Sequence, residues 1–441
     1  MGAGIASSDY TESASPRSGH RRVRTPVGNA AAADLPAVAH FLNEVVGGPS
    51  AAEFKASVED PAYQSRDRLL LRRGQRLVAH AHLTRRLMQC GSAHLPAAGL
   101  RHLCVAPSCR GQGLGRHLLT AAERQMAEYA AVGLMRTAAP HFFRRSGWAL
   151  CGRHSYSRAD ARALLARMLD HGLHHRKPRA LHIRPWRQWE LGALARIYNQ
   201  NLPGSWGALH RHEAYWQWLV QRQAFDQIYV ALEGPELLDL REEQTRIVGY
   251  AVVRGEAIVE LRTSPDRPRA AWELTARVCG DAIEHDRCTV TLFAPAEHPL
   301  HAALLDAGGL LRHCDADRGE VYMARLLDPL AVLRRLCGEL HRRAERARLP
   351  RPFDLGLLVE GRKYQIEVNG DEATVTDQRL GRSYLRMNVA EFTRLLLGQL
   401  DWDWALKDRR LEVSTALAEQ AGRVLFPVLP FYRPVLDDLE A

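Results

Sequence analysis

The sequence of 441 residues lacks several features that would place it in a class at once. No apolar run approaches the roughly 20 residues that a membrane-spanning helix needs. The eight cysteines are scattered without a C-x-x-C pair, which argues against a zinc site or a disulfide framework. Lys and Arg exceed Asp and Glu by 60 to 50, but no basic block with interleaved aromatic residues occurs. We therefore expect a cytoplasmic protein with no metal, no nucleic-acid partner and no membrane span.

Length and composition favour a folded protein of several domains. Hydrophobic residues make up 46% of the chain and charged residues 25%, which is typical of globular proteins. A chain of this length predicts two to four domains. We expect three, preceded by a flexible tail over residues 1–20: a first unit over 21–170, a second over 180–326 and a third over 327–441. A charged, histidine-rich linker, 171–179, separates the first two units.

The first unit shows the pattern of a mixed sheet. A helix is predicted from Asp34 to the glycines at 47–48. The segments 68–71 and 77–83 flank a turn and predict an antiparallel hairpin. A strand over 100–105 then leads through a glycine-rich turn into a helix over 114–130 and a strand over 132–135. This order predicts a βαβ crossover after an antiparallel meander, which is an α/β arrangement.

The second unit repeats that order of elements, which indicates an internal duplication. After its strand over 257–263, however, the sequence SPDRPRAAW places prolines where the first unit has glycines. Proline has no N–H to present, so we expect a structural role for the second unit. The third unit has a helix over 329–346, hairpin-like strands between 354 and 378, and helices near 388–397 and 414–425. This unit is predicted to be α+β.

The glycine-rich turn of the first unit carries the chemistry. In VAPSCRGQGLGR, residues 105–116, Gly111, Gly113 and Gly115 leave successive N–H groups uncovered at a helix start, where they can bind a pyrophosphate. Arg110 and Arg116 add cations for phosphate oxygens. The Lys-Ser/Thr pair of a nucleotide-hydrolysing P-loop is absent, and the preceding hairpin fits a dinucleotide-binding fold badly.

This turn resembles motif A of the GNAT acetyltransferases, and HFFRRSGW, residues 141–148, resembles the short helix and Gly-aromatic turn of that family. The segments 387–398 and 425–439 resemble the sterol-carrier-like domain that closes the enhanced intracellular survival (Eis) acetyltransferases. That family consists of an active GNAT domain, a degenerate GNAT domain and this third domain. The resemblance therefore implies two tandem GNAT-like mixed-sheet domains followed by a sterol-carrier-like α+β domain.

The same resemblance implies an N-acetyltransferase that uses acetyl-CoA and forms a homo-oligomer such as a hexamer. Its acceptor would be a primary amine of a small molecule or of a lysine side chain. The residues that match the family's cofactor site are Leu103, Cys104, Val105, Arg110, Gly111, Gln112, Gly113, Leu114, Gly115 and Arg116. The first three belong to a strand whose backbone binds the pantetheine arm and polarises the thioester carbonyl.

The catalytic residues are less clearly indicated. In the family, the C-terminal carboxylate acts as base, which here is that of Ala441. The family's acid is a tyrosine, but this chain has Phe143 at that position, and phenylalanine cannot donate a proton. Tyr156 is another candidate acid, and His80 and His82 are candidate bases by their titration range. A non-catalytic acetyl-CoA-binding or lipid-binding protein remains the alternative.

Overall fold

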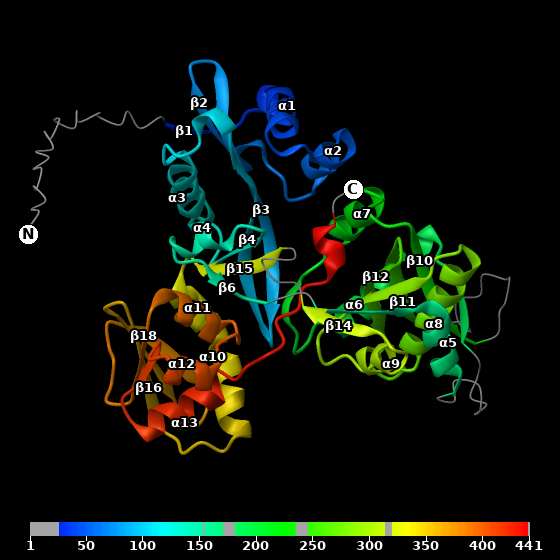
Figure 1. Ribbon diagram of the computed structural model, residues 1–441. Coiled ribbons are helices and arrows are strands. Elements are labelled where there is room, and N and C mark those ends of the chain that lie inside the picture. The colour runs from blue at the N-terminus through cyan, green and yellow to red at the C-terminus, as the bar shows by residue number, and fades with distance from the viewer. Residues whose placement is uncertain (1–25, 153–154, 171–180, 235–245, 314–319, 440–441) are drawn as a thin grey trace, which may run out of the picture.

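The computed structural model describes residues 26–152, 155–170, 181–234, 246–313 and 320–439. Three parts, each with its own sheet, are arranged around a long central strand, β3 (Figure 1). The first part holds the glycine-rich turn, the second lies beside it, and the third lies at the far end of β3.

The first sheet has the order β1-β2-β3-β4-β5-β15-β6, and β9 also pairs with β3. The predicted meander is confirmed because β2, β3 and β4 pair antiparallel. The crossover is confirmed as well, since β4 and β5 pair in parallel on either side of α3. The strands are β1 Val27–Asn29, β2 Arg68–Arg73, β3 Arg76–Cys90, β4 Ala93–Val105, β5 Val132–Thr137, β6 Ala149–Leu150, β9 Trp206–Leu209 and β15 Val321–Leu326.

Helices cover this sheet through apolar faces that recur at helical spacing. In α3 the buried residues are Leu118, Leu119, Ala122 and Met126, which follow the i, i+3, i+4 rule and pack on β3 and β4. The helix that was predicted from Asp34 ends at Gly47, which has a φ of 73° and so closes the helix in the left-handed conformation. The helices of this part are α1 Leu35–Val46, α2 Ala51–Glu59, α3 Leu114–Ala127 and α4 Pro140–Arg144.

The second sheet has the order β14-β7-β13-β12-β11-β10-β8, and β12 and β13 pair in parallel as β4 and β5 do. Its strands are β7 Ser155–Asp160, β8 His182–Pro185, β10 Gln227–Glu233, β11 Arg246–Arg254, β12 Ala257–Thr263, β13 Thr289–Phe293 and β14 Leu310–His313. Its helices are α5 Ala161–Asp170, α6 Leu191–Gln200, α7 Glu213–Gln221, α8 Ala270–Glu284 and α9 Leu300–Asp306.

The first two parts exchange strands, which corrects the predicted boundaries at 170 and 326. β7 was expected in the first unit but pairs with β13 and β14 in the second sheet. β15 was expected in the second unit but pairs with β5 and β6 in the first sheet. Both strands are only six residues long, and their pairing depends on contacts with residues far away in the chain, so the local sequence gives no preference.

The third part is α+β, as predicted, with a sheet of order β18-β17-β16-β19-β20. Its strands are β16 Phe353–Val359, β17 Arg362–Val368, β18 Ala373–Asp377, β19 Tyr384–Met387 and β20 Leu411–Val413, and its helices are α10 Pro329–Arg346, α11 Val389–Leu396, α12 Trp402–Lys407 and α13 Ala416–Leu425. Its core is continuous with the far half of the first sheet, because Leu333 and Leu336 of α10 belong to one buried cluster with Leu95 of β4.

The C-terminal segment leaves the third part after α13 and runs back between the first two parts (Figure 1). It ends in a short 3-10 helix, η5 (Val435–Asp438), whose four residues are all buried. Residues of η5 pack into the aromatic core of the second part, beside Tyr198 and Trp216. The end of the described chain is therefore an internal element that joins the parts.

Candidate active site

The glycine-rich turn lies between the end of β4 and the start of α3. Gly111 and Gly113 have φ of 75° and 80°, in the left-handed region that glycine occupies without strain. Gly113 is also the N-cap residue of α3, and it supplies no side-chain hydrogen bond to the helix. The first N–H groups of α3 are therefore left for a ligand, and the positive end of the helix dipole favours an anion there.

Side chains fix the shape of this turn. Arg73, at the end of β2, donates to Oε1 of Gln112 over 2.5 Å and contacts the sulfur of Cys109 over 3.8 Å. Arg110 donates from Nε to the carbonyl oxygen of Val105 over 3.2 Å. Arg110 and Arg116 are exposed on this surface. The structure thus brings the predicted residues 110–116 together on one face, next to the strand end that holds Leu103 to Val105.

The strands β4 and β5 separate beside this turn. They pair only between 97–99 and 132–134, although β4 continues to Val105 and β5 to Thr137. A cavity of about 120 Å³ lies where they part, between residues 100–102 of β4 and 134–136 of β5. We call this cavity the wedge. The backbone of Leu103, Cys104 and Val105 has no pairing with β5, so on that side it is free to bind an extended ligand.

A bulge in β4 opens the wedge. His80 pairs with Cys104 while His82 pairs with Arg101, so one residue of β3 faces two residues of β4. His102, in the bulge, has a φ of 49°. A non-glycine residue in this conformation costs about 1–3 kcal/mol, and such strain is concentrated at functional sites.

His80 holds the bulge and is not suited to act as a base. Its Nε2 lies 3.3 Å from Nη1 of Arg68, which can only donate, so Nε2 accepts. Nδ1 must then carry the proton, and it donates to the carbonyl oxygen of His102 over 3.1 Å. Burial, followed by the charge of Arg68, lowers the pKa of His80 to about 3. Both ring nitrogens are therefore occupied, and we assign His80 a positioning role.

His82 is buried on the same part of β3. Its ring packs edge-on against Tyr63 at 5.9 Å, and its Nδ1 has no hydrogen-bond partner among the described residues. Burial and the charge of Arg68 lower its pKa well below the usual range. The ring is neutral at physiological pH, but its low pKa makes it a weak base.

The two neighbouring phenylalanines of α4 face different surroundings. Phe143, at the position of the family's tyrosine, is buried and packs against Trp148 at 6.4 Å. Phe142 is 39% exposed, and its ring lies where a side chain on Gly115 would contact it at 3.4 Å. Phe142 is thus the residue of this helix that faces the glycine-rich turn. Tyr156, the other candidate acid, lies in the second sheet, where it packs on Phe293.

Asp438 of η5 lies at the wedge. Its carboxylate accepts from the Tyr322 hydroxyl over 2.5 Å, and it pairs with Arg433 at 2.8 Å and with Arg101 at 3.5 Å. Burial alone would raise its pKa, but Arg433 and Arg101 lower it to about 2. A carboxylate with so low a pKa takes up a proton poorly, so Asp438 anchors the segment.

Asp437 fixes the same segment to the second part through a buried charge cluster. Arg211 binds both carboxylate oxygens of Asp437, each at 3.0 Å, and both oxygens of Glu260 at 2.6 and 2.9 Å. Tyr215 donates to Asp437 at 3.2 Å, and Tyr250 donates to Glu260 at 2.5 Å. Burial by itself would lower the pKa of Arg211, but the two carboxylates raise it well above its usual range.

The sequence did not indicate this cluster, since Arg211 and Asp437 are far apart in the chain and belong to no shared motif. The signal that existed was a pair of acidic residues in an otherwise apolar C-terminal segment, FYRPVLDDL. Ala441, the predicted base, lies outside the described residues.

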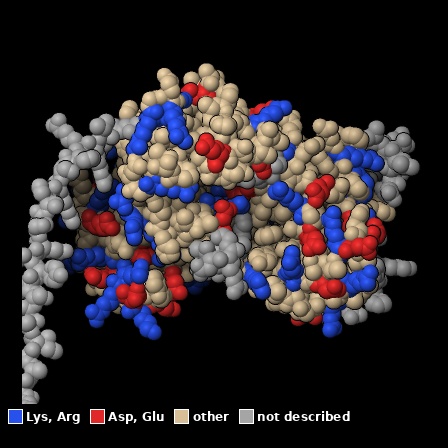
Figure 2. Space-filling model, turned by 45° about the horizontal axis from the view of Figure 1, so that its top comes forward, with Lys and Arg blue, Asp and Glu red and all other residues tan. Residues whose placement is uncertain are grey.

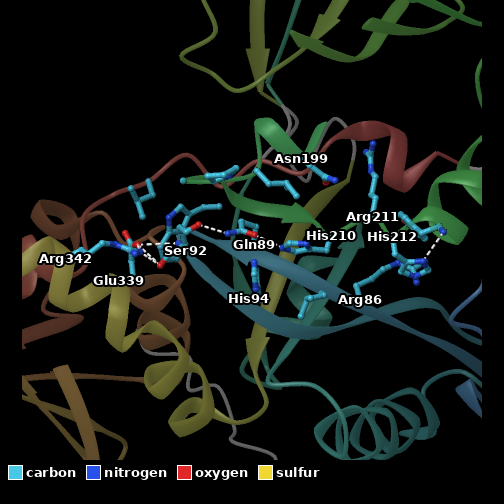
Figure 3. Close-up of a pocket in the computed structure, with 18 of the residues that line it drawn as sticks. Arg86, Gln89, Ser92, His94, Asn199, His210, Arg211, His212, Glu339 and Arg342 are labelled. Atoms are coloured by element: carbon cyan, nitrogen blue, oxygen red, sulfur yellow. Dashed lines mark hydrogen bonds and ion pairs between the residues drawn. The ribbon is translucent and has the colours of Figure 1, made fainter. Parts of the chain in front are cut away.

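A larger cavity of about 1300 Å³ lies where the three parts meet, along the far half of β3 (Figure 3). Figure 3 shows Arg342 and Glu339 of α10 at one end, Gln89, His94 and His210 in the middle, and Arg86 and Arg211 at the other end. Six of the lining side chains are arginines, and most of them are held in ion pairs with nearby carboxylates, as Arg86 is with Asp60 and Arg343 with Glu339.

On the face of the molecule that Figure 2 shows, cationic and anionic side chains are interspersed. None of the described helices is long and apolar enough to cross a membrane. Within the described ranges, no group of three His, Cys, Asp or Glu side chains could hold a metal ion.

Comparison with known proteins gives a match to the first part. Residues 27–151 match the family model described as an acetyltransferase (GNAT) domain. A search of curated proteins gives no match.

Solved structures share the whole three-part fold. A GCN5-related N-acetyltransferase from Anabaena variabilis superposes with a TM-score of 0.70 at 16% identity, over 92% of this chain and 98% of that chain. One from Kribbella flavida also has a TM-score of 0.70 at 16% identity, over 92% and 97% of the two chains. Eis1 from Mycobacterium abscessus has a TM-score of 0.63 at 16% identity, over 91% and 97%. At such low identity, these likenesses establish the fold.

Proposed function

We propose that the protein is an N-acetyltransferase, which transfers the acetyl group of acetyl-CoA to a primary amine of a small molecule or of a lysine side chain. The observation that carries the proposal is the presence of two features along the last residues of β4 and the turn that follows it. An uncapped helix start with left-handed glycines suits a pyrophosphate. The wedge between β4 and β5, next to it, suits a thioester arm.

The donor would be held mainly by backbone groups. N–H groups of residues 111 to 115 would bind the pyrophosphate, with Arg110 and Arg116 as cationic partners. The exposed backbone of Leu103, Cys104 and Val105 would pair with the pantetheine arm. The match to the acetyltransferase (GNAT) family model over residues 27–151 supports this assignment.

The reaction would be a direct attack. The amine nitrogen forms a bond with the thioester carbonyl carbon, the carbon–sulfur bond breaks, and coenzyme A leaves as a thiolate that takes up a proton. During the attack, negative charge develops on the carbonyl oxygen. An N–H of the splayed strand, aimed at that oxygen, would be the main electrostatic aid because it needs no reorganisation.

The acceptor arrives as an ammonium and must lose a proton first. His80 is hydrogen-bonded at both ring nitrogens, and Asp438 has a pKa of about 2, so neither is a suitable base. We assign the role to the terminal carboxylate of Ala441. Leu439 is held by Arg222, which donates to its carbonyl oxygen over 2.8 Å.

Helix α4 holds no tyrosine that could protonate the thiolate, since its two aromatic residues are the buried Phe143 and Phe142, which faces the glycine-rich turn. A thiol has a pKa of only about 8.5, so the thiolate is a tolerable leaving group at neutral pH. We therefore propose that water completes this step and that turnover is slower than it would be with an acid in place.

We also propose a homo-oligomer and a sterol-carrier-like third part, on the family resemblance of 387–398 and 425–439.

Thiol release from acetyl-CoA, measured with a panel of amines, tests the proposal. Calorimetry of coenzyme A binding to Gly113→Asp tests the turn, because the variant places bulk and negative charge against the pyrophosphate. We expect its dissociation constant to rise by about 100-fold or more, as like charges in contact cost several kcal/mol. Gly255→Asp is the matched control, since Gly255 has a φ of 60° in an open turn of the second sheet. Equal affinity in the two variants would exclude the turn as the cofactor site.

The alternative is a protein that binds acetyl-CoA without catalysis, and it is favoured by the burial of Phe143. It predicts tight cofactor binding with no thiol released under any amine. Turnover with even one amine class would exclude it.

A further inference from the structure

We infer that the amine acceptor also carries an anionic group, such as a carboxylate, and that Arg101 of β4 recognises this group. The inference rests on the proposed function and names its substrate class. The inference follows from the charges around the wedge. These charges are mainly those of arginine side chains, so they would repel a polycationic acceptor.

The wedge is lined by three arginines, Arg101, Arg136 and Arg433, and by two acidic residues, Glu320 and Asp438. Both acids are already engaged. Arg136 forms an ion pair with Glu320, and Arg433 binds Asp438 at 2.8 Å. No carboxylate of the wedge is left for a second ammonium group of an acceptor, because each is held by a guanidinium.

Arg101 is the cation that remains for a ligand. Its contact with Asp438 is long, at 3.5 Å, and its other bond is a 3.3 Å contact with the carbonyl oxygen of Asp437. Its side chain is 29% exposed, so the guanidinium reaches the cavity. It also lies one residue before the strained His102, where the strand opens. A planar guanidinium in this place fits a carboxylate through charge-assisted hydrogen bonds.

A second cation behind the bulge strengthens the positive field. Arg68 is fully buried, and among the described residues no acidic side chain forms an ion pair with it. Its guanidinium bonds to the hydroxyl of Ser57 at 2.6 Å and to His80, and it lies over the ring of Phe54 at 4.7 Å. Its Nε has no hydrogen-bond partner in the described chain. A buried cation without a counterion is stabilised when an anion binds nearby.

The pKa shifts of the histidines agree with this field. Burial comes first, and then the charges of Arg101 and Arg68 lower the pKa of His102 to about 4. A polycationic acceptor would therefore meet like charge at the wedge, which opposes binding.

A series of linear amines that differ only at the far end tests the inference. At each chain length from three to six carbons, three compounds are compared. The far end of the chain is a carboxylate in the ω-amino acid, a methyl group in the alkylamine and an ammonium in the α,ω-diamine. We expect kcat/KM of the unaltered protein to fall in that order at the best length. One charge-assisted hydrogen bond predicts a preference of about ten-fold or more for the carboxylate over the methyl group.

Variants show whether Arg101 is responsible. Arg101→Gln should raise KM for the amino acid about ten-fold or more while kcat/KM for the alkylamine stays within about two-fold. Arg101→Lys should restore part of the preference, because the charge is kept. The exposed Arg124 on α3 provides the control, and Arg124→Gln should leave the ranking unchanged.

The possible failures can be told apart. A higher kcat/KM for the diamines than for the amino acids would overturn this inference, and equal kcat/KM for all three end groups would do the same. Either result would leave the acetyltransferase proposal intact. A full carboxylate preference in Arg101→Gln would overturn the role of Arg101. If no amine of any set released thiol, the proposed function would fail and this inference with it.

Discussion

Replacing Arg211 should destabilise the protein more than the loss of any exposed arginine. Its side chain is fully buried and binds four carboxylate oxygens, two each from Glu260 and Asp437. Methionine has a similar volume but no charge, so Arg211→Met leaves two buried carboxylates without their cation. This change also removes one of the links between η5 and the second part, while the bonds of Arg222 and the apolar contacts of Val435 and Leu436 remain.

The expected magnitude follows from the remaining partners. Removing one member of a buried ion pair costs about 3–5 kcal/mol, because the other charge is left uncompensated. Here each carboxylate keeps one tyrosine donor, Tyr250 for Glu260 and Tyr215 for Asp437. We therefore expect the lower end of the range, about 3 kcal/mol in the free energy of unfolding.

Urea unfolding followed by tryptophan fluorescence measures this loss, and Trp216 and Trp218 lie in the same aromatic core as η5. With a denaturant slope of about 3 kcal/mol per M, the midpoint should move down by about 1 M. Arg386→Met is the control. Its ion pair with Glu412 is 3.5 Å long and both side chains are more than 60% exposed, so the loss should stay below about 1 kcal/mol. A deficit in Arg211→Met no larger than that of Arg386→Met would refute the reasoning.

Two further predictions concern the β4 bulge and the missing acid. The folded-state pKa of His80, about 3, lies below its unfolded value near 6.5. The contribution of the neutral ring to stability is therefore present above pH 6.5 and is lost as the pH falls. Between pH 6.5 and pH 5 the loss in the free energy of unfolding amounts to about 2 kcal/mol. His80→Gln should lose that share of the acid sensitivity in unfolding titrations, and an unchanged pH profile would contradict the assignment. Phe142→Tyr should raise kcat, because Phe142 faces the glycine-rich turn and a tyrosine there would place a proton donor beside it. Phe143→Tyr should instead bury an unpaired hydroxyl, which lowers the free energy of unfolding by about 1–3 kcal/mol without raising kcat. Equal kcat in the two tyrosine variants would contradict the assignment of Phe142.

Much of the first part could be predicted from the sequence because its signals are local. The hairpin of β2 and β3, the helix α3 and the parallel return to β5 each follow from periodicity and turn residues within a few positions. The turn itself was predicted for the same reason: left-handed φ at Gly111 and Gly113 is a property of those residues alone.

The side-chain environments of the site could not be predicted in this way. His80 was a candidate base until its two nitrogens were seen to be bonded to Arg68 and His102. Phe142 and Phe143 are adjacent and chemically identical in the sequence. Only the packing of α4 on the sheet and on α3 decides which of them is buried.

The sequence by itself indicated three parts and a glycine-rich turn after β4, because glycine conformation and helix periodicity act over short stretches. Tertiary structure alone decided that β7 and β15 exchange sheets, and that Arg211, Glu260 and Asp437 form one buried cluster. Strand pairing and ion pairing join residues far apart in the chain. Their free energy depends on burial that only the folded molecule provides.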